Sequence, residues 1–144
     1  MKRLERKHLK EDELTHTLRV AREFVEPRQQ MLKNVGIAAV AERLGAGFIP
    51  IRKPGKLPAK AIKETYDLEY GKDALEIHED AVDKGQKVLI VDDVLATGGT
   101  AAAAAGLVKR TGGQLTGLAF LIELLFLQGK AKLNGENVYS VLQY

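Results

Sequence analysis

Residues 87–100, which read KVLIVDDVLATGGT, constrain the fold of this chain more than any other stretch. Val88 to Val91 are four β-favouring apolar residues, a pattern typical of a strand that is buried on both faces. Two carboxylates, Asp92 and Asp93, follow where we expect this strand to end. A loop of small residues, 96–100, then leads into an alanine-rich run that favours a helix. This order predicts a phosphate site at the carboxyl end of a parallel strand.

The loop is suited to an anion because it combines glycine with hydroxyl groups and a helix start. Its candidate phosphate-binding residues are Ala96, Thr97, Gly98, Gly99 and Thr100. Glycine lets backbone N–H groups approach an anion closely, and the helix N-terminus adds a partial charge of roughly +0.5. Neither a Walker A sequence nor a GxGxxG fingerprint is present.

The acidic pair makes the prediction more specific. Asp92 and Asp93 would repel a phosphate unless they face another group. Carboxylates accept hydrogen bonds from vicinal sugar hydroxyls, or they bind Mg²⁺ through oxygen. The stretch therefore predicts a ligand that carries a phosphate beside a diol-bearing sugar.

Composition narrows the class of protein. The chain has 144 residues, no cysteine and a formal net charge of +3. These values predict one domain without disulfides in a reducing compartment, and we expect a cytoplasmic location. No apolar run approaches the roughly 20 residues that span a bilayer, and no signal-peptide core is visible, so we expect no membrane partner. The basic residues near the N-terminus fit a solvated helix face better than a nucleic-acid site.

Strands alternating with helices predict an α/β fold with a mainly parallel sheet. We expect one domain, 1–144, in which an N-terminal helical segment (1–34) precedes the core (35–144). The expected elements are an amphipathic helix at 1–26, a helix at 35–44, a strand at 47–52, a mobile basic loop at 53–65, a hairpin of 66–70 and 74–78 that turns at 71–73, the central strand and helix, a strand at 114–124, a short helix or loop at 125–133 and a strand at 138–142.

Several motifs in order resemble one known family. Residues 88–100 look like the ribose-phosphate motif of type I phosphoribosyltransferases. Ile51 to Pro58 (IRKPGKLP), Leu68 to Lys72 (LEYGK) and Tyr139 to Tyr144 (YSVLQY) narrow the resemblance to the adenine phosphoribosyltransferase family. The similarity covers the chain from about Val40 to its end.

This resemblance implies a type I phosphoribosyltransferase fold with a flexible hairpin loop. It implies purine salvage, in which the 5-phosphoribosyl group of phosphoribosyl pyrophosphate passes to adenine and gives AMP and pyrophosphate. Mg²⁺ would be bound through phosphoribosyl pyrophosphate, and the chain would form a homodimer. Asp92 and Asp93 would hold the ribose hydroxyls, and residues 96–100 the 5′-phosphate. Glu69 and Tyr70 would be catalytic, with Glu69 assisting proton transfer at the base.

Three basic residues are weaker candidates for the pyrophosphate and base side. Arg52, Lys53 and Lys56 carry charges that suit phosphate oxygens, and without the resemblance a solvated loop explains them equally well.

Two motifs of the family are missing from this sequence. One is the N-terminal hood with its Phe-Pro and Phe-Arg-Asp-Ile-like segments, and the other is a Gly-Ile-Glu-Ala-Arg-Gly-Phe-like pyrophosphate loop. The sequence therefore keeps two alternatives beside the active enzyme. One is a phosphoribosyltransferase fold, natural or engineered, that only binds phosphoribosyl pyrophosphate or AMP, and the other is a scaffold.

Overall fold

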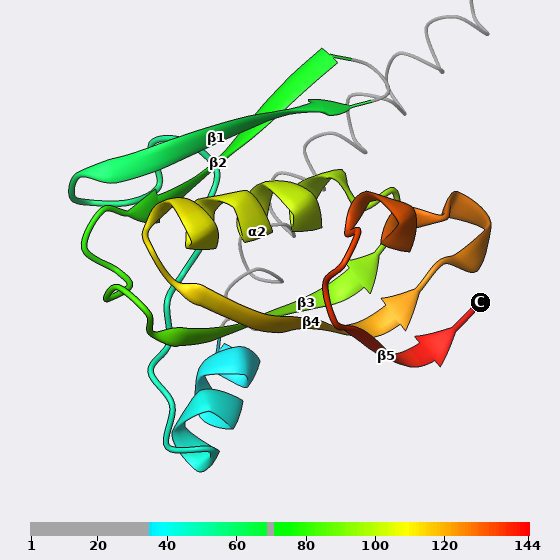
Figure 1. Ribbon diagram of the computed structural model, residues 1–144, viewed down its shortest axis with the longest axis horizontal. Coiled ribbons are helices and arrows are strands. Elements are labelled where there is room, and N and C mark those ends of the chain that lie inside the picture. The colour runs from blue at the N-terminus through cyan, green and yellow to red at the C-terminus, as the bar shows by residue number, and fades with distance from the viewer. Residues whose placement is uncertain (1–34, 69–70) are drawn as a thin grey trace, which may run out of the picture. The chain divides into compact units, whose positions relative to one another are not determined.

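The computed structural model describes residues 35–68 and 71–144 (Figure 1). By internal contacts the chain divides into two compact units, Met1–Phe48 and Ile49–Tyr144. The amphipathic helix predicted at 1–26 lies outside the described residues, as do Glu69 and Tyr70, the residues predicted to be catalytic.

The described part of the first unit is a short helix, residues 35–43, followed by a turn at 44–45. Gly45 has a φ of +64°, a value that glycine adopts more easily than other residues after a helix. The helix and its stop at Gly45 are confirmed. Val35, Val40 and Leu44 are exposed on this unit.

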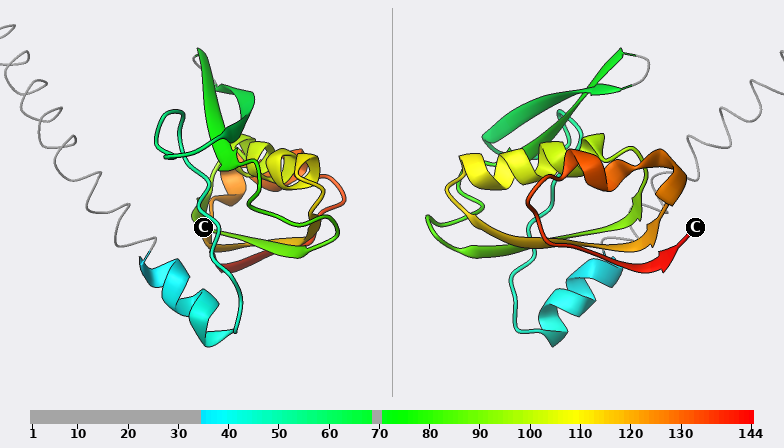
Figure 2. Two further views of the ribbon diagram at one scale, coloured as in Figure 1. Left: turned by 90° about the vertical axis from the view of Figure 1, so that its left-hand side faces the viewer. Right: turned by 45° about the vertical axis from the view of Figure 1, so that its right-hand side comes forward.

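The second unit contains a three-stranded parallel sheet, as the alternation of strands and helices predicted. Its strands are β3 (Lys87–Leu95), β4 (Gln114–Glu123) and β5 (Val138–Gln143), in the order β3-β4-β5. The helix α2 (Gly99–Arg110) connects β3 to β4 and lies over one face of the sheet (Figures 1 and 2). Two 3₁₀ turns, η1 (Leu125–Leu127) and η2 (Gly129–Lys132), lead from β4 toward β5.

A β-hairpin covers the other side of α2 (Figure 2). Its antiparallel strands are β1 (Ala61–Leu68) and β2 (Gly71–His78), in which Leu68 pairs with Gly71. The hairpin is confirmed, but two boundaries were wrong. The basic loop ends at residue 60 because the alternating exposure of residues 61–67 belongs to β1. Residues 71–73, which were expected to form the turn, belong to β2.

The core has two parts, because α2 packs against the hairpin on one side and against the three-stranded sheet on the other. Between the hairpin and α2 lie Leu75, Ile77, Val82, Ala103, Ala104 and Leu107. Between α2 and the sheet lie Leu95, Ala101, Leu118, Phe120 and Leu133. The small alanine side chains let both layers approach α2 closely, so the helix behind the loop is held from two sides.

Two further expectations were wrong. Residues 47–52 do not form a strand, because only Arg52 makes a β-bridge, with Glu76. β3 is not buried on both faces: Leu89 is 52% exposed and Val91 39% exposed, on the face away from α2. No helix among the described residues has the length and apolar character needed to cross a membrane.

Candidate functional site

The loop between β3 and α2 has the geometry of an anion site. Gly98 is the N-cap of α2 with φ 78° and ψ −5°, and its carbonyl accepts a hydrogen bond of 2.9 Å from the N–H of Ala102. A left-handed residue beside right-handed ones turns successive N–H groups toward one concavity. The first turn of α2 contains no acidic residue, and no side-chain hydrogen bond caps it. Gly99 and Thr100 are the first two helical residues, so the predicted loop and helix start are joined.

The strand β3 is longer than expected, so the acidic pair lies inside it and not after its end. β3 continues to Leu95, so Asp92 and Asp93 are inside the strand near its carboxyl end. The backbone N–H of Asp93 donates to Oδ1 of Asp92 at 2.9 Å. Asp92 is exposed and Asp93 half-buried. The carboxylates therefore precede the loop by only a few residues, at the same edge of the sheet.

A series of polar contacts connects the loop to the hairpin and to residues 52–56, which we call the basic segment. The hydroxyl of Thr100 donates to Oη of Tyr66 at 3.2 Å, and Tyr66 donates to Oδ2 of Asp73 at 3.3 Å. The ammonium of Lys53 donates to the same carboxylate oxygen at 2.7 Å. Two residues predicted from sequence, Thr100 and Lys53, are thus linked through two hairpin residues that the sequence did not single out.

The ion pair between Lys53 and Asp73 has one exposed and one partly buried partner. The side chain of Lys53 is 68% exposed and that of Asp73 is 21% exposed. The hydrogen bond from Lys53 lowers the pKa of Asp73 below its ordinary value of 3.8, and the backbone N–H of Ala74 adds to this effect. Both contacts favour the charged carboxylate.

The other basic candidates lie on the same segment. The backbone of Arg52 exchanges two hydrogen bonds with Glu76 on β2, at 2.9 and 2.7 Å. The carboxylate of Glu76 also accepts from the N–H of Gly55 at 2.9 Å. Lys56 is exposed. The structure therefore fixes the backbone of this segment against the hairpin, while Lys53 and Lys56 are exposed and Arg52 is half-buried.

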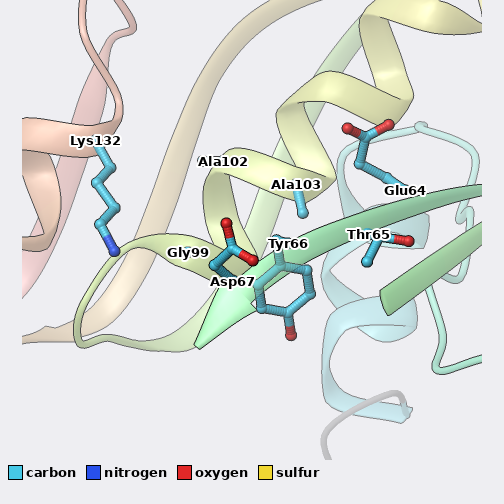
Figure 3. Close-up of a pocket in the computed structure, with 8 residues that line it drawn as sticks. All are labelled: Glu64, Thr65, Tyr66, Asp67, Gly99, Ala102, Ala103 and Lys132. Atoms are coloured by element: carbon cyan, nitrogen blue, oxygen red, sulfur yellow. The ribbon is translucent and has the colours of Figure 1, made fainter. Parts of the chain in front are cut away.

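A cavity of about 330 Å³ lies between the hairpin and the start of α2 (Figure 3). It is lined by Glu64, Thr65, Tyr66, Asp67, Gly99, Ala102, Ala103 and Lys132. In Figure 3 the ammonium of Lys132 extends from η2 toward the loop, and the carboxylate of Asp67 lies beside Gly99. Sequence reasoning missed Lys132 because it lies in an irregular turn far along the chain from the loop. Tyr66 was visible only as one residue of a hairpin pattern.

Residues 19–138 match the family described as phosphoribosyl transferase domain. The chain belongs to this family. It is 63% identical over 106 residues to an adenine phosphoribosyltransferase of Koribacter versatilis, covering 74% of this chain and 58% of that relative. The crystal structure of adenine phosphoribosyltransferase from Thermoanaerobacter pseudethanolicus matches with a TM-score of 0.73 and 55% identity, covering 74% of this chain and 62% of that one. The Saccharomyces cerevisiae enzyme, solved with adenine and an imino-altritol bisphosphate, matches with a TM-score of 0.70 and 47% identity, over 72% of this chain and 58% of that one.

This phosphoribosyl transferase domain therefore spans about three fifths of the length of the relatives that it matches. The family assignment agrees with the expected type I fold and with the parallel sheet that carries the loop. Across the described ranges, 35–68 and 71–144, no three or more His, Asp or Glu side chains are grouped so that they could hold a metal ion.

Proposed function

We propose that the chain is an adenine phosphoribosyltransferase that acts in purine salvage in the cytoplasm. It transfers the 5-phosphoribosyl group of phosphoribosyl pyrophosphate to adenine and releases AMP and pyrophosphate. One observation supports the proposal most directly. The strand β3 contains the acidic pair and is followed by a glycine loop, in which the left-handed Gly98 is the N-cap of α2. The relatives named above support the choice of adenine as the base.

The reaction exchanges one bond at the anomeric carbon. The bond from C1′ to the pyrophosphate oxygen breaks, and a bond from C1′ to N9 of adenine forms, while the proton of N9 leaves. The carboxylates of Asp92 and Asp93 accept hydrogen bonds from the ribose hydroxyls and fix the sugar. The loop of Ala96, Thr97, Gly98, Gly99 and Thr100 holds the 5′-phosphate, which orients C1′ toward the base.

Proton transfer at the base is assigned to Glu69, with Tyr70 beside it, on the resemblance alone. Both residues follow β1 directly in the sequence. The resemblance implies that the loop with these residues closes over the site. Such closure would exclude water from a transition state with oxocarbenium character, and so limit hydrolysis.

Cations near the loop supply the counter-charge for the phosphate groups. Arg52, Lys53 and Lys56 are assigned to the departing pyrophosphate. Lys132 lines the cavity beside Gly99, where an ammonium group would attract the 5′-phosphate. Mg²⁺ would be bound through the phosphate oxygens of phosphoribosyl pyrophosphate rather than directly by the protein, since Mg²⁺ commonly takes substrate phosphates as ligands. When bound, Mg²⁺ neutralises part of the leaving-group charge.

A second function is favoured by the motifs of the sequence. The 144 residues lack the Phe-Pro and Phe-Arg-Asp-Ile-like segments and the Gly-Ile-Glu-Ala-Arg-Gly-Phe-like loop that the resemblance leads us to expect. A protein with these properties would bind phosphoribosyl pyrophosphate or AMP through the loop without turnover. We also propose a homodimer, on the resemblance.

The test is a product assay with purified protein, adenine, phosphoribosyl pyrophosphate and Mg²⁺, in which AMP is separated by chromatography. We expect AMP from the unaltered chain and none from the double variant Asp92→Asn, Asp93→Asn. The matched control is Asp80→Asn with Asp83→Asn, which removes the same charge from the exposed segment before β3. AMP formation by the first double variant at the unaltered rate would sink the assignment of the acidic pair.

Calorimetry separates the two candidate functions. Phosphoribosyl pyrophosphate that binds without any AMP formation identifies the binding-only protein. A protein that shows no binding and no turnover would contradict both functions.

A further inference from the structure

The loop packs against a backbone segment from a distant part of the chain. Gly129 opens η2 and is buried against residues 96–98. A Cβ added to Gly129 would lie well under 3.0 Å from the carbonyl oxygen of Ala96 and at 3.0 Å from the nitrogen of Gly98. A Cβ added to Gly98 would meet the carbonyl oxygen of Gly129 equally closely. The two glycines therefore occupy the space that each other's side chain would need.

The two positions require glycine for different reasons. Gly98 has a φ of +78°, so both backbone conformation and space favour glycine there. Gly129 is not among the residues with positive φ, so its backbone suits any L-residue. Space alone restricts Gly129, which makes this position a purely steric probe of the contact.

The segment that carries Gly129 has little freedom to move away. On its N-terminal side, the N–H of Leu124 donates to the carbonyl of Leu95, the last residue of β3, at 3.0 Å. On its C-terminal side, Leu133 is 4% exposed and belongs to the core between α2 and the sheet. A side chain at Gly129 would therefore displace the loop rather than η2.

We infer that Gly129 is a positioning residue for the phosphate loop, acting through Ala96 and Gly98. Backbone donors bind an anion well only at about 2.7–3.1 Å from its oxygen atoms, so a shift of a few tenths of an ångström weakens several contacts together. This role rests on the proposed function for its ligand, the 5′-phosphate. The steric contact itself exists without any ligand.

The experiment compares Gly129→Ala with Gly106→Ala. Gly106 is in α2, where an added Cβ would make only ordinary contacts at 3.8 Å or more with the side chain of Glu64. Three quantities are measured for each variant: the Kd of ribose 5-phosphate by calorimetry, the amide resonances of residues 97–100 without ligand, and the thermal unfolding midpoint.

We expect Gly129→Ala to raise the Kd about tenfold or more and to move the amide resonances of the loop, in protein that remains folded at the assay temperature. Gly106→Ala should leave both unchanged. Loop resonances of Gly129→Ala that coincide with those of the unaltered chain would overturn the inference. If Gly129→Ala proved unfolded at the assay temperature, its loop resonances would be recorded at a lower temperature where it folds, and unchanged resonances there would overturn the inference too. If the unaltered chain fails to bind ribose 5-phosphate, the proposed function fails, while the ligand-free resonances still decide the role of Gly129.

Discussion

The phosphate loop and the basic segment are both candidates to bind phosphate groups, but they are built differently. The loop, residues 96–100, uses backbone N–H groups that a helix, a strand and a buried glycine contact hold in place. The basic segment, residues 52–56, presents side chains from a backbone that pairs with β2. Its ion-paired cation, Lys53, is 68% exposed.

This difference concerns what is fixed before a ligand arrives. Backbone donors in the loop have already lost their conformational freedom on folding, so they bind without a further ordering cost. A long exposed lysine must be ordered at each binding event, and salt screens its charge. Substitutions in the loop should therefore cost more than substitutions in the basic segment.

The largest effect is expected for Gly98→Ala. An alanine at φ +78° is strained, and its Cβ would overlap the carbonyl of Gly129. We expect the loop to rearrange and the Kd of ribose 5-phosphate to rise about a hundredfold, which corresponds to about 2.7 kcal/mol. Isothermal calorimetry measures this directly.

Gly135→Ala is the matched control because it separates strain from overlap. Gly135 has a φ of +79°, but an added Cβ would have nothing within 4 Å. We expect it to lower the free energy of unfolding by about 1 kcal/mol and to leave binding unchanged. Equal binding losses in both variants would show that a general loss of stability, not the contact with Gly129, weakens binding.

Local patterns were sufficient to predict most of the fold. The apolar run of β3 and the alanines of α2 each determine their structure from neighbouring residues. The expectation failed at residues 47–52, where an apolar pattern predicted a strand. A strand requires a partner along its length, and the described residues offer this segment a bridge only at Arg52. Pairing is a long-range property that a local pattern does not contain.

The same distinction applies to the site. The loop could be predicted because its residues are consecutive and their chemistry depends on spacing alone. Tyr66, Gly129 and Lys132 could not, since each reaches the loop from another element through the fold. A glycine in a short turn has the same sequence signature whether it supplies flexibility or a close backbone contact.

A smaller effect is expected for Tyr66→Phe, which cuts the link between the two regions. The variant loses the bonds to Thr100 and Asp73, at 3.2 and 3.3 Å, but keeps the ring. Such long bonds contribute about 0.5–1 kcal/mol each. Because Glu69 and Tyr70, the proposed catalytic residues, directly follow β1 in the sequence, we expect kcat/KM to fall about three- to fivefold, while the Kd of ribose 5-phosphate changes by less than about twofold.

Tyr139→Phe serves as the control, since Tyr139 is 68% exposed on β5. It should change neither quantity. Amide hydrogen exchange adds a second readout, because exchange across β1 and β2 should quicken in Tyr66→Phe alone. A variant with normal turnover and normal exchange would mean that the hairpin is held to the loop by packing on α2, without help from the polar chain.

The smallest effect is expected for the ion pair of the basic segment, and it depends on pH. A carboxyl group whose pKa is lower in the folded protein adds stability above its ordinary pKa of 3.8 and loses it as pH falls through the lowered pKa. We therefore expect the free energy of unfolding of Asp73→Asn to be lower than that of the unaltered chain near pH 5. The two values should converge as pH approaches about 2. The difference should be small because Lys53 is mostly exposed, and it should shrink in high salt. Urea denaturation at a series of pH values measures this difference.

Lys53→Met should flatten the pH dependence in the same direction, because the bond from Lys53 is the main cause of the lowered pKa of Asp73. A pH dependence that Asp73→Asn leaves unaltered would show that this pair is formed at no measurable gain, which would make the contrast with the backbone-built loop sharper still.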